Sequence, residues 1–212
     1  MTWNAKLVFA PDLRAALARH RESGAIASMV LRPMPAGASF SPVLVDADGR
    51  VRAIRGGAEP PAPGLAARMY TGVQILHPRA HRDLPDEGDV IEHAYQRWLA
   101  RGEIVSSVTE LAPWHDIGVT LRHYLHTNLA LLRGELRWPG VEPDTRGVLI
   151  AADAQIASDA SLDQVAVGRG ARIAPGVSLR RCVVWPGAVA DRNLQDAVVT
   201  PRQVVPAGPD AA

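Results

Sequence analysis

The segment that comes closest to a catalytic or metal-binding motif in this chain contains one carboxylate, that of Asp116. Residues 114–118 read Trp-His-Asp-Ile-Gly, and a helix is expected to begin soon after them, near Leu121. From the residues alone, Asp116 is predicted to cap a turn or that helix, because short acidic side chains accept hydrogen bonds from unpaired backbone N–H groups.

The other side chains with reactive or metal-binding chemistry form no site by spacing. Histidine can bind metals, but histidines without neighbouring cysteines or carboxylates at ligand spacing make no metal motif. Six of the seven histidines are of this kind: His20, His77, His81, His93, His123 and His126. The seventh, His115, adjoins Asp116. Cys182, the one cysteine, is expected to be a small core residue.

Composition excludes several classes of function. The 212 residues carry a net charge of +1, and charged residues make up 21% of the chain. This balance gives no basic surface for nucleic acid. No apolar run reaches the length of a membrane span, and the N-terminus does not resemble a secretory signal. One cysteine allows no disulfide within the chain and fits a reducing compartment. We therefore expect a cytoplasmic protein with no nucleic-acid or membrane partner.

Alternating strand and helix signals predict an α/β fold for residues 1–138. Strands are expected at 6–9, 25–31, 42–46 and 51–54, with a turn at Asp48 and Gly49 and a helix from Pro11 to Gly24. Residues 56–68 form a loop rich in Gly and Pro, either an active-site loop or a surface excursion. Further strands are expected at 69–76 and 103–108, and further helices at 89–102 and 121–132.

A different pattern begins near residue 147 and predicts a β-helix over 147–200, followed by a flexible tail at 201–212. Aliphatic residues recur at intervals of six and later of five, with small residues between them. A strand alternates by two and a helix by three or four, whereas a six-residue interval fits a triangular solenoid with one inward residue per side. The expected inward residues are Ile150, Ile156, Leu162, Val167, Ile173 and Leu179, and the pattern continues at less regular five-residue steps through Val184, Val189, Leu194 and Val199.

The order of these features resembles that in the sugar-1-phosphate nucleotidyltransferases, especially mannose-1-phosphate guanylyltransferase and related NDP-sugar pyrophosphorylases. The resemblance rests on Tyr-Thr-Gly-Val at 70–73, Trp-His-Asp-Ile-Gly at 114–118, Tyr124 with Asn128, and the six-residue repeats. It implies a partial Rossmann-like sheet followed by a left-handed parallel β-helix. It also implies the joining of a nucleoside triphosphate and a sugar 1-phosphate with release of pyrophosphate, assisted by Mg²⁺.

The resemblance assigns site roles only in part. Asp116 matches the second of two metal-binding aspartates, whereas Lys6 stands where the first is expected, in Asn4-Ala5-Lys6 instead of Asn-Gly-Asp. An ammonium group cannot ligate Mg²⁺ and repels it. Thr71 and Gly72 match the turn that contacts the sugar, and Asn4 and Glu59 match further substrate-binding positions. If Lys6 replaces the first aspartate, its side chain should lie beside Asp116.

Three functions remain open at this stage. The first is nucleotidyl transfer in NDP-sugar synthesis, for which this chain, without the family's glycine-rich nucleotide loop, is expected to be truncated or inactive alone. The second is a non-catalytic regulatory or scaffolding subunit of such an enzyme. The third is a hexapeptide acyltransferase, which commonly needs a histidine base in the coils, whereas no histidine follows His126. Expected partners are a sugar 1-phosphate or NDP-sugar, a second copy, or a chain that supplies the missing half.

Overall fold

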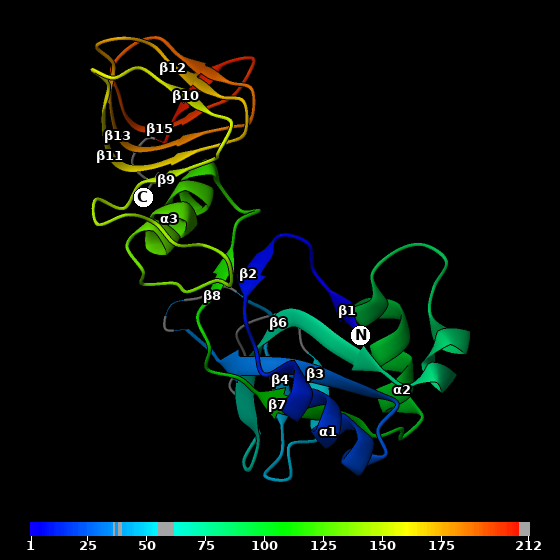
Figure 1. Ribbon diagram of the computed structural model, residues 1–212. Coiled ribbons are helices and arrows are strands. Elements are labelled where there is room, and N and C mark those ends of the chain that lie inside the picture. The colour runs from blue at the N-terminus through cyan, green and yellow to red at the C-terminus, as the bar shows by residue number, and fades with distance from the viewer. Residues whose placement is uncertain (36, 38–39, 55–61, 208–212) are drawn as a thin grey trace. The chain divides into compact units, whose positions relative to one another are not determined.

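The chain folds into two compact units, Met1–Trp114 and His115–Ala212 (Figure 1). The computed structural model describes residues 1–35, 37, 40–54 and 62–207. The predicted boundary region, residues 139–146, lies inside the second unit, and the helix predicted at 121–132 belongs to that unit as well. Among the described residues, no helix has the length and apolar character needed to cross a membrane.

The first unit is built on a mixed β-sheet, which confirms the expected combination of strands and helices. Its main path runs in the order β5 (Val51–Ile54), β4 (Val43–Val45), β6 (Ala66–Leu76), β3 (Ala27–Pro33) and β7 (Val105–Thr109). Only β3 and β7 are parallel, and the other pairs along this path are antiparallel. The short strand β1 (Thr2–Trp3) adds to β6, and β2 (Leu7–Phe9) follows it in the chain.

Helices cover both faces of this sheet. Helix α1 (Leu13–Ser23) begins where the Asp12 carboxylate accepts a hydrogen bond from Ala15 N at 2.9 Å, and it ends at Gly24 in left-handed conformation. It packs over a cluster that contains Phe9, Ala16, Val30 and Val73. The other face is covered by three short helices: the 3₁₀ helix η1 (Pro78–Asp83), the π-helix η2 (Ile91–Tyr95) and α2 (Gln96–Ala100). Tyr95 and Trp98 from these helices belong to a second cluster.

The β4–β5 hairpin curls back onto β7. Ser107 contributes two hydrogen bonds to Gly49 O, one from its backbone N and one from its hydroxyl, each 2.8 Å long. A β-bridge between Arg50 and Ser106 adds to this contact. The predicted Asp48–Gly49 turn therefore does more than join two strands, because it ties the hairpin to the far edge of the sheet.

The second unit combines one helix with a parallel β-solenoid of about three turns. Helix α3 (Leu121–Leu132) begins at Thr120, whose hydroxyl accepts a hydrogen bond from His123 N at 3.1 Å. One solenoid sheet contains β9 (Leu149–Ile150), β11 (Ser161–Val167), β13 (Ser178–Val184) and β15 (Leu194–Val199), and the other contains β10 (Gln155–Ile156), β12 (Arg172–Ile173) and β14 (Val189–Ala190). Strand β16 (Val204–Pro206), within the predicted tail, pairs antiparallel with β15.

The register of the strands shows which side chains point inward. Leu162 pairs with Leu179, seventeen residues later, and Leu179 pairs with Leu194, fifteen residues later. Cys182 is fully buried among these residues, as predicted for a small core side chain. Most of the predicted inward residues are buried in the same cluster, and Ile156 and Leu194 pack at its margin.

One predicted inward residue, Ile150, is wrong, and the later aliphatic residue Val189 also faces solvent. Ile150 is 43% exposed although it pairs with the buried Val167, because β9 is the last strand of its sheet and has a neighbour on one side only. Val189 is 44% exposed, and Ala190 beside it occupies the inward position next to Ile173. A pattern of large aliphatic residues does not reveal an inward position that is occupied by a small residue such as Ala190.

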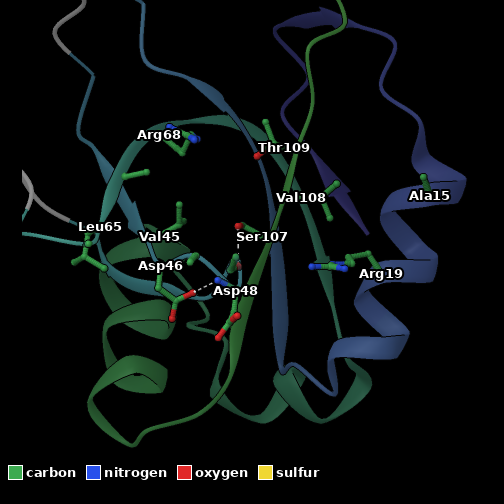
Figure 2. A pocket seen from close by; sticks show the side chains of 14 residues that line it. Ala15, Arg19, Val45, Asp46, Asp48, Leu65, Arg68, Ser107, Val108 and Thr109 are labelled. Atoms are coloured by element: carbon green, nitrogen blue, oxygen red, sulfur yellow. Dashed lines mark hydrogen bonds between the residues drawn. The ribbon is translucent and has the colours of Figure 1, made fainter.

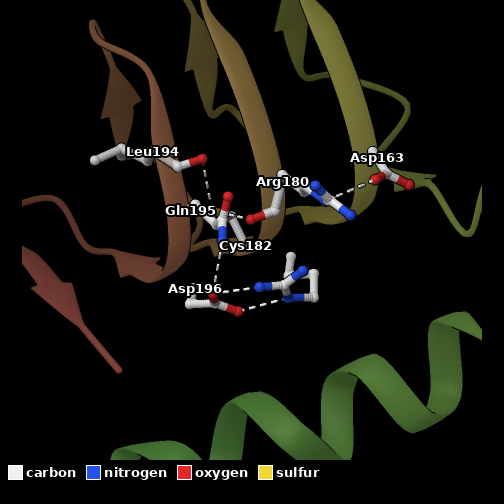
Figure 3. Close-up of polar contacts among 7 residues, drawn as sticks. Asp163, Arg180, Cys182, Leu194, Gln195 and Asp196 are labelled. Atoms are coloured by element: carbon white, nitrogen blue, oxygen red, sulfur yellow. Dashed lines mark hydrogen bonds and ion pairs between the residues drawn. The ribbon is translucent and has the colours of Figure 1, made fainter. Parts of the chain in front are cut away.

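A column of left-handed residues runs along the solenoid, and Figure 3 shows one of them, Asp196, with its carboxylate joined by dashed lines to a guanidinium. Gln164, Arg181 and Asp196 occupy equivalent places in successive coils, with φ of 53°, 49° and 50°. Left-handed backbone costs an ordinary residue about 1–2 kcal/mol. The Arg181 guanidinium binds both carboxylate oxygens of Asp196, with Nε to Oδ1 at 2.6 Å. This bidentate pair ties two coils together where the backbone is least favourable.

Candidate functional site

The predicted Thr71–Gly72 turn is instead part of the continuous strand β6, at an irregularity in its pairing with β3 where residues 4–7 come close; we keep the name turn for these two residues. Gly72 has a φ of +85°, which side-chain-bearing residues rarely adopt. A Cβ atom at this position would lie 2.7 Å from Leu7 Cδ1 and 3.0 Å from the Asn4 Cβ atom. Both the backbone angle and the contact with residues 4–7 therefore require glycine here.

The segment that carries Asn4 and Lys6 is fixed to this turn through its backbone. Asn4 N donates to Gly72 O at 3.0 Å, and Leu7 N donates back to Asn4 O at 3.2 Å. The Asn4 side chain accepts a hydrogen bond from Lys6 N at 3.3 Å. Asn4 and Lys6 are both exposed, so their side chains are accessible beside a turn that their own backbone helps to hold.

Trp114 completes this group of contacts from a third part of the chain. Its indole Nε1 donates to Thr71 O at 2.9 Å, and its ring packs against the α1 face of the sheet. The Thr71 hydroxyl is buried and donates to Val30 O at 2.7 Å. Thr71 thus contributes to the fold through its side chain, and the accessible side chains nearby are those of Asn4 and Lys6. We refer to Asn4, Thr71, Gly72 and Trp114 as the turn cluster.

The structure places Asp116 at a turn, in agreement with the reading from residues alone. Its Oδ1 accepts a hydrogen bond from Gly118 N at 2.8 Å, whereas the cap of α3 is Thr120. Asp116 belongs to the second unit and Lys6 to the first, so their pairing stays a prediction. Glu59, the remaining predicted substrate contact, lies outside the described residues.

The described side chains form no cluster of three potential metal ligands. Over residues 1–35, 37, 40–54 and 62–207, no three His, Cys, Asp or Glu side chains gather in a way that could hold a metal ion. The metal-binding role that the resemblance implies for Asp116 requires a second carboxylate at the position where Lys6 stands. One carboxylate is a poor site for Mg²⁺ unless substrate phosphates add ligands.

A pocket of about 770 Å³ opens where the β4–β5 hairpin meets β7 (Figure 2). Two arginines border it, Arg68 from β6 and Arg19 from α1, and the turn residues Asp46 and Asp48 lie at its other side. Sequence reasoning missed this pocket, because it depends on the curling of the hairpin. The local signal is Arg68 itself, the one charged residue of β6.

The charge of Asp46 is already compensated within the turn. Its carboxylate lies 2.6 Å from Arg52 Nη2 and accepts hydrogen bonds from the backbone N of Asp48 and of Arg50. Desolvation raises the pKa of Asp46, but these hydrogen bonds outweigh it, and the net pKa is lowered. Asp46 therefore remains ionised and paired at neutral pH and serves mainly to shape the turn.

Comparisons with known proteins do not place the chain in a family. No model of a known protein family matches the sequence, and no curated protein matches it either.

Proposed function

We propose that this chain is a member of the sugar-1-phosphate nucleotidyltransferase family that binds the sugar-phosphate side of the reaction and does not transfer a nucleotide by itself. In this proposal the first unit is a partial Rossmann-like sheet, and the solenoid is a left-handed β-helix. The observation that carries the proposal is the turn cluster. Three motifs that are far apart in the sequence, at residues 4, 71–72 and 114, meet through two hydrogen bonds of 3.0 Å and 2.9 Å.

The cluster supports binding because it holds a short polar side chain in a fixed place at the surface. Leu7 and Asn4 fill the space where Gly72 has no side chain, and the Asn4 amide is exposed beside it. An amide can both donate to and accept from sugar hydroxyls. Positioning of this kind is most of what phosphoryl-transfer proteins supply.

The loss of transfer follows from Lys6. Lys6 immediately follows the segment that contacts Gly72, at the position where the family would place a metal-binding aspartate. An ammonium group there adds positive charge where the reaction requires a cation to be bound. The substitution therefore accounts for a loss of catalysis while the backbone contact between Asn4 and Gly72 is kept.

Pyrophosphate release provides the test of inactivity. The purified 212-residue chain is incubated with Mg²⁺, a panel of nucleoside triphosphates and a panel of sugar 1-phosphates, with an active NDP-sugar pyrophosphorylase as positive control. We expect no turnover above the background of the assay. A rate above roughly 1 s⁻¹, which is at the low end of ordinary enzymes, would show that Lys6 does not abolish the chemistry.

The alternative function is a non-catalytic regulatory or scaffolding subunit of such an enzyme. It is favoured by the use of the Thr71 hydroxyl and the Trp114 indole in contacts that hold the fold together. The two functions differ in one respect that can be measured. The first requires a sugar 1-phosphate to bind at the turn cluster, and the second does not.

A further inference from the structure

The hairpin pocket has a donor group that nothing in the described structure satisfies. Arg68 is half-buried, and its Nη1 donates to Ala67 O at 3.2 Å. Its Nε is buried and, among the described residues, has no hydrogen-bond partner. Buried polar atoms are paired in the great majority of cases, so an exception beside a cavity points to an absent partner.

The unsatisfied edge of this arginine has a definite chemistry. Because Nη1 is used by Ala67, the Nε and Nη2 groups remain as two parallel donors on one side of the guanidinium. This is the geometry with which arginine takes an oxyanion, such as a phosphate or carboxylate, through two hydrogen bonds. A second guanidinium, that of Arg19, borders the same pocket from α1 (Figure 2).

The rest of the pocket is suited to hydroxyl groups. Ser107 and Thr109 of β7 line it, and Asp48 borders it on the side opposite Arg68 (Figure 2). Asp46 adds little free charge, because Arg52 and two backbone N–H groups already compensate its carboxylate. In the described lining, the Arg68 donors lie toward one end and the Asp48 carboxylate toward the other, and Arg19 borders the pocket from the α1 side (Figure 2).

We propose that this pocket binds a small phosphorylated polyol, with the phosphate on Arg68 and the hydroxyl groups toward Asp48. A volume of about 770 Å³ is ample for a ligand of this size. The site is separate from the turn cluster, and the inference rests on the pocket alone, whether or not the proposed function holds.

The test is a titration of the ¹⁵N-labelled chain with glucose 6-phosphate, inorganic phosphate and glucose as probes. We expect shifts of the Ser107 and Thr109 amide signals with glucose 6-phosphate, weaker shifts with inorganic phosphate, and none with glucose. Equal shifts with inorganic phosphate and glucose 6-phosphate would overturn the polyol part of the proposal. The absence of shifts at Ser107 and Thr109 with both phosphates would overturn all of it.

Variants locate the phosphate. Arg68→Gln keeps a polar side chain but removes the charge and the paired donors, and it should weaken glucose 6-phosphate binding about tenfold or more, as expected for loss of hydrogen bonds to a charged group. Arg68→Lys retains the positive charge but not the two parallel donors, and it should also weaken glucose 6-phosphate binding. The control is Arg14→Gln, an exposed change on α1 outside the pocket, which should bind as the parent does. Parent-like affinity in a folded Arg68→Gln variant would contradict the proposal.

Discussion

Replacement of Gly72 by alanine should destabilise the first unit more than any other glycine-to-alanine change with a similar backbone angle. Two effects add. Left-handed backbone costs a side-chain-bearing residue about 1–2 kcal/mol. The new Cβ would also lie 2.7 Å from Leu7 Cδ1 and 3.0 Å from the Asn4 Cβ, and crowding of this kind in a packed region typically costs about 1–3 kcal/mol. Together these predict a loss of about 2–5 kcal/mol in the free energy of unfolding.

Gly24 provides the matched control for this measurement. It ends α1 with a φ of +63°, and a Cβ there would meet no heavy atom within 4 Å. Gly24→Ala should therefore carry the backbone cost alone, about 1–2 kcal/mol. The difference between the two variants measures the close approach of residues 4–7 to the turn.

Urea unfolding followed by the amide signals of β3 and β6 reports the first unit without contribution from the solenoid. The reasoning predicts that Gly72→Ala unfolds at clearly lower urea than Gly24→Ala. Equal midpoints for the two variants would refute it, because they would show that the Asn4 segment does not rest on the turn. In that case the turn cluster would lose its geometric basis.

Three further predictions concern stability. Asp196→Asn introduces a residue that also tolerates positive φ but removes the ion pair with Arg181. It should lower the free energy of unfolding of the solenoid, measured in urea, by about 1 kcal/mol. An unchanged free energy of unfolding would show that the pair is dispensable. Burial, and then nearby positive charge, lowers the pKa of His20. The native state therefore favours the neutral imidazole. The His20 contribution to stability should be complete above the unfolded-state pKa of about 6.5 and should be lost as the pH falls below that value. A pH-independent midpoint from 8 to 5.5, or one that His20→Gln does not flatten, would contradict this. Ile150→Ser should cost well under 1 kcal/mol, as exposed changes do, and a larger loss would show that Ile150 is covered.

The arrangement of elements was largely predictable because local signals agreed with tertiary packing. Asp12 and Gly24 marked the ends of α1, and Asp48 with Gly49 marked the hairpin turn. The six-residue interval indicated the solenoid, since each buried aliphatic residue lies on one side of a coil. The prediction failed at Ile150, which is 43% exposed because β9 is the last strand of its sheet.

The sequence predicted the candidate site only at those residues that belong to short recognisable motifs. Gly72 and Trp114 stood in recognisable motifs, and the structure joins them to Asn4 through backbone contacts that no sequence pattern encodes. The hairpin pocket had no motif, because Arg68, Arg19 and Asp48 border one cavity only after the hairpin has curled onto β7. Spacing along the chain does not report a contact that depends on the curvature of a sheet.

Titration with a sugar 1-phosphate tests the central claim most directly. The ¹⁵N-labelled chain is titrated with mannose 1-phosphate and glucose 1-phosphate, and the signals of the Trp114 indole N–H and of the Asn4 and Gly72 amides are followed. The account predicts saturable shifts at these positions and several-fold weaker binding in Asn4→Ala, whereas Asp86→Asn, an exposed change in a distant loop, should bind as the parent does. If millimolar sugar 1-phosphate leaves these three signals unmoved, or shifts them equally in Asn4→Ala, the turn cluster does not bind a sugar phosphate.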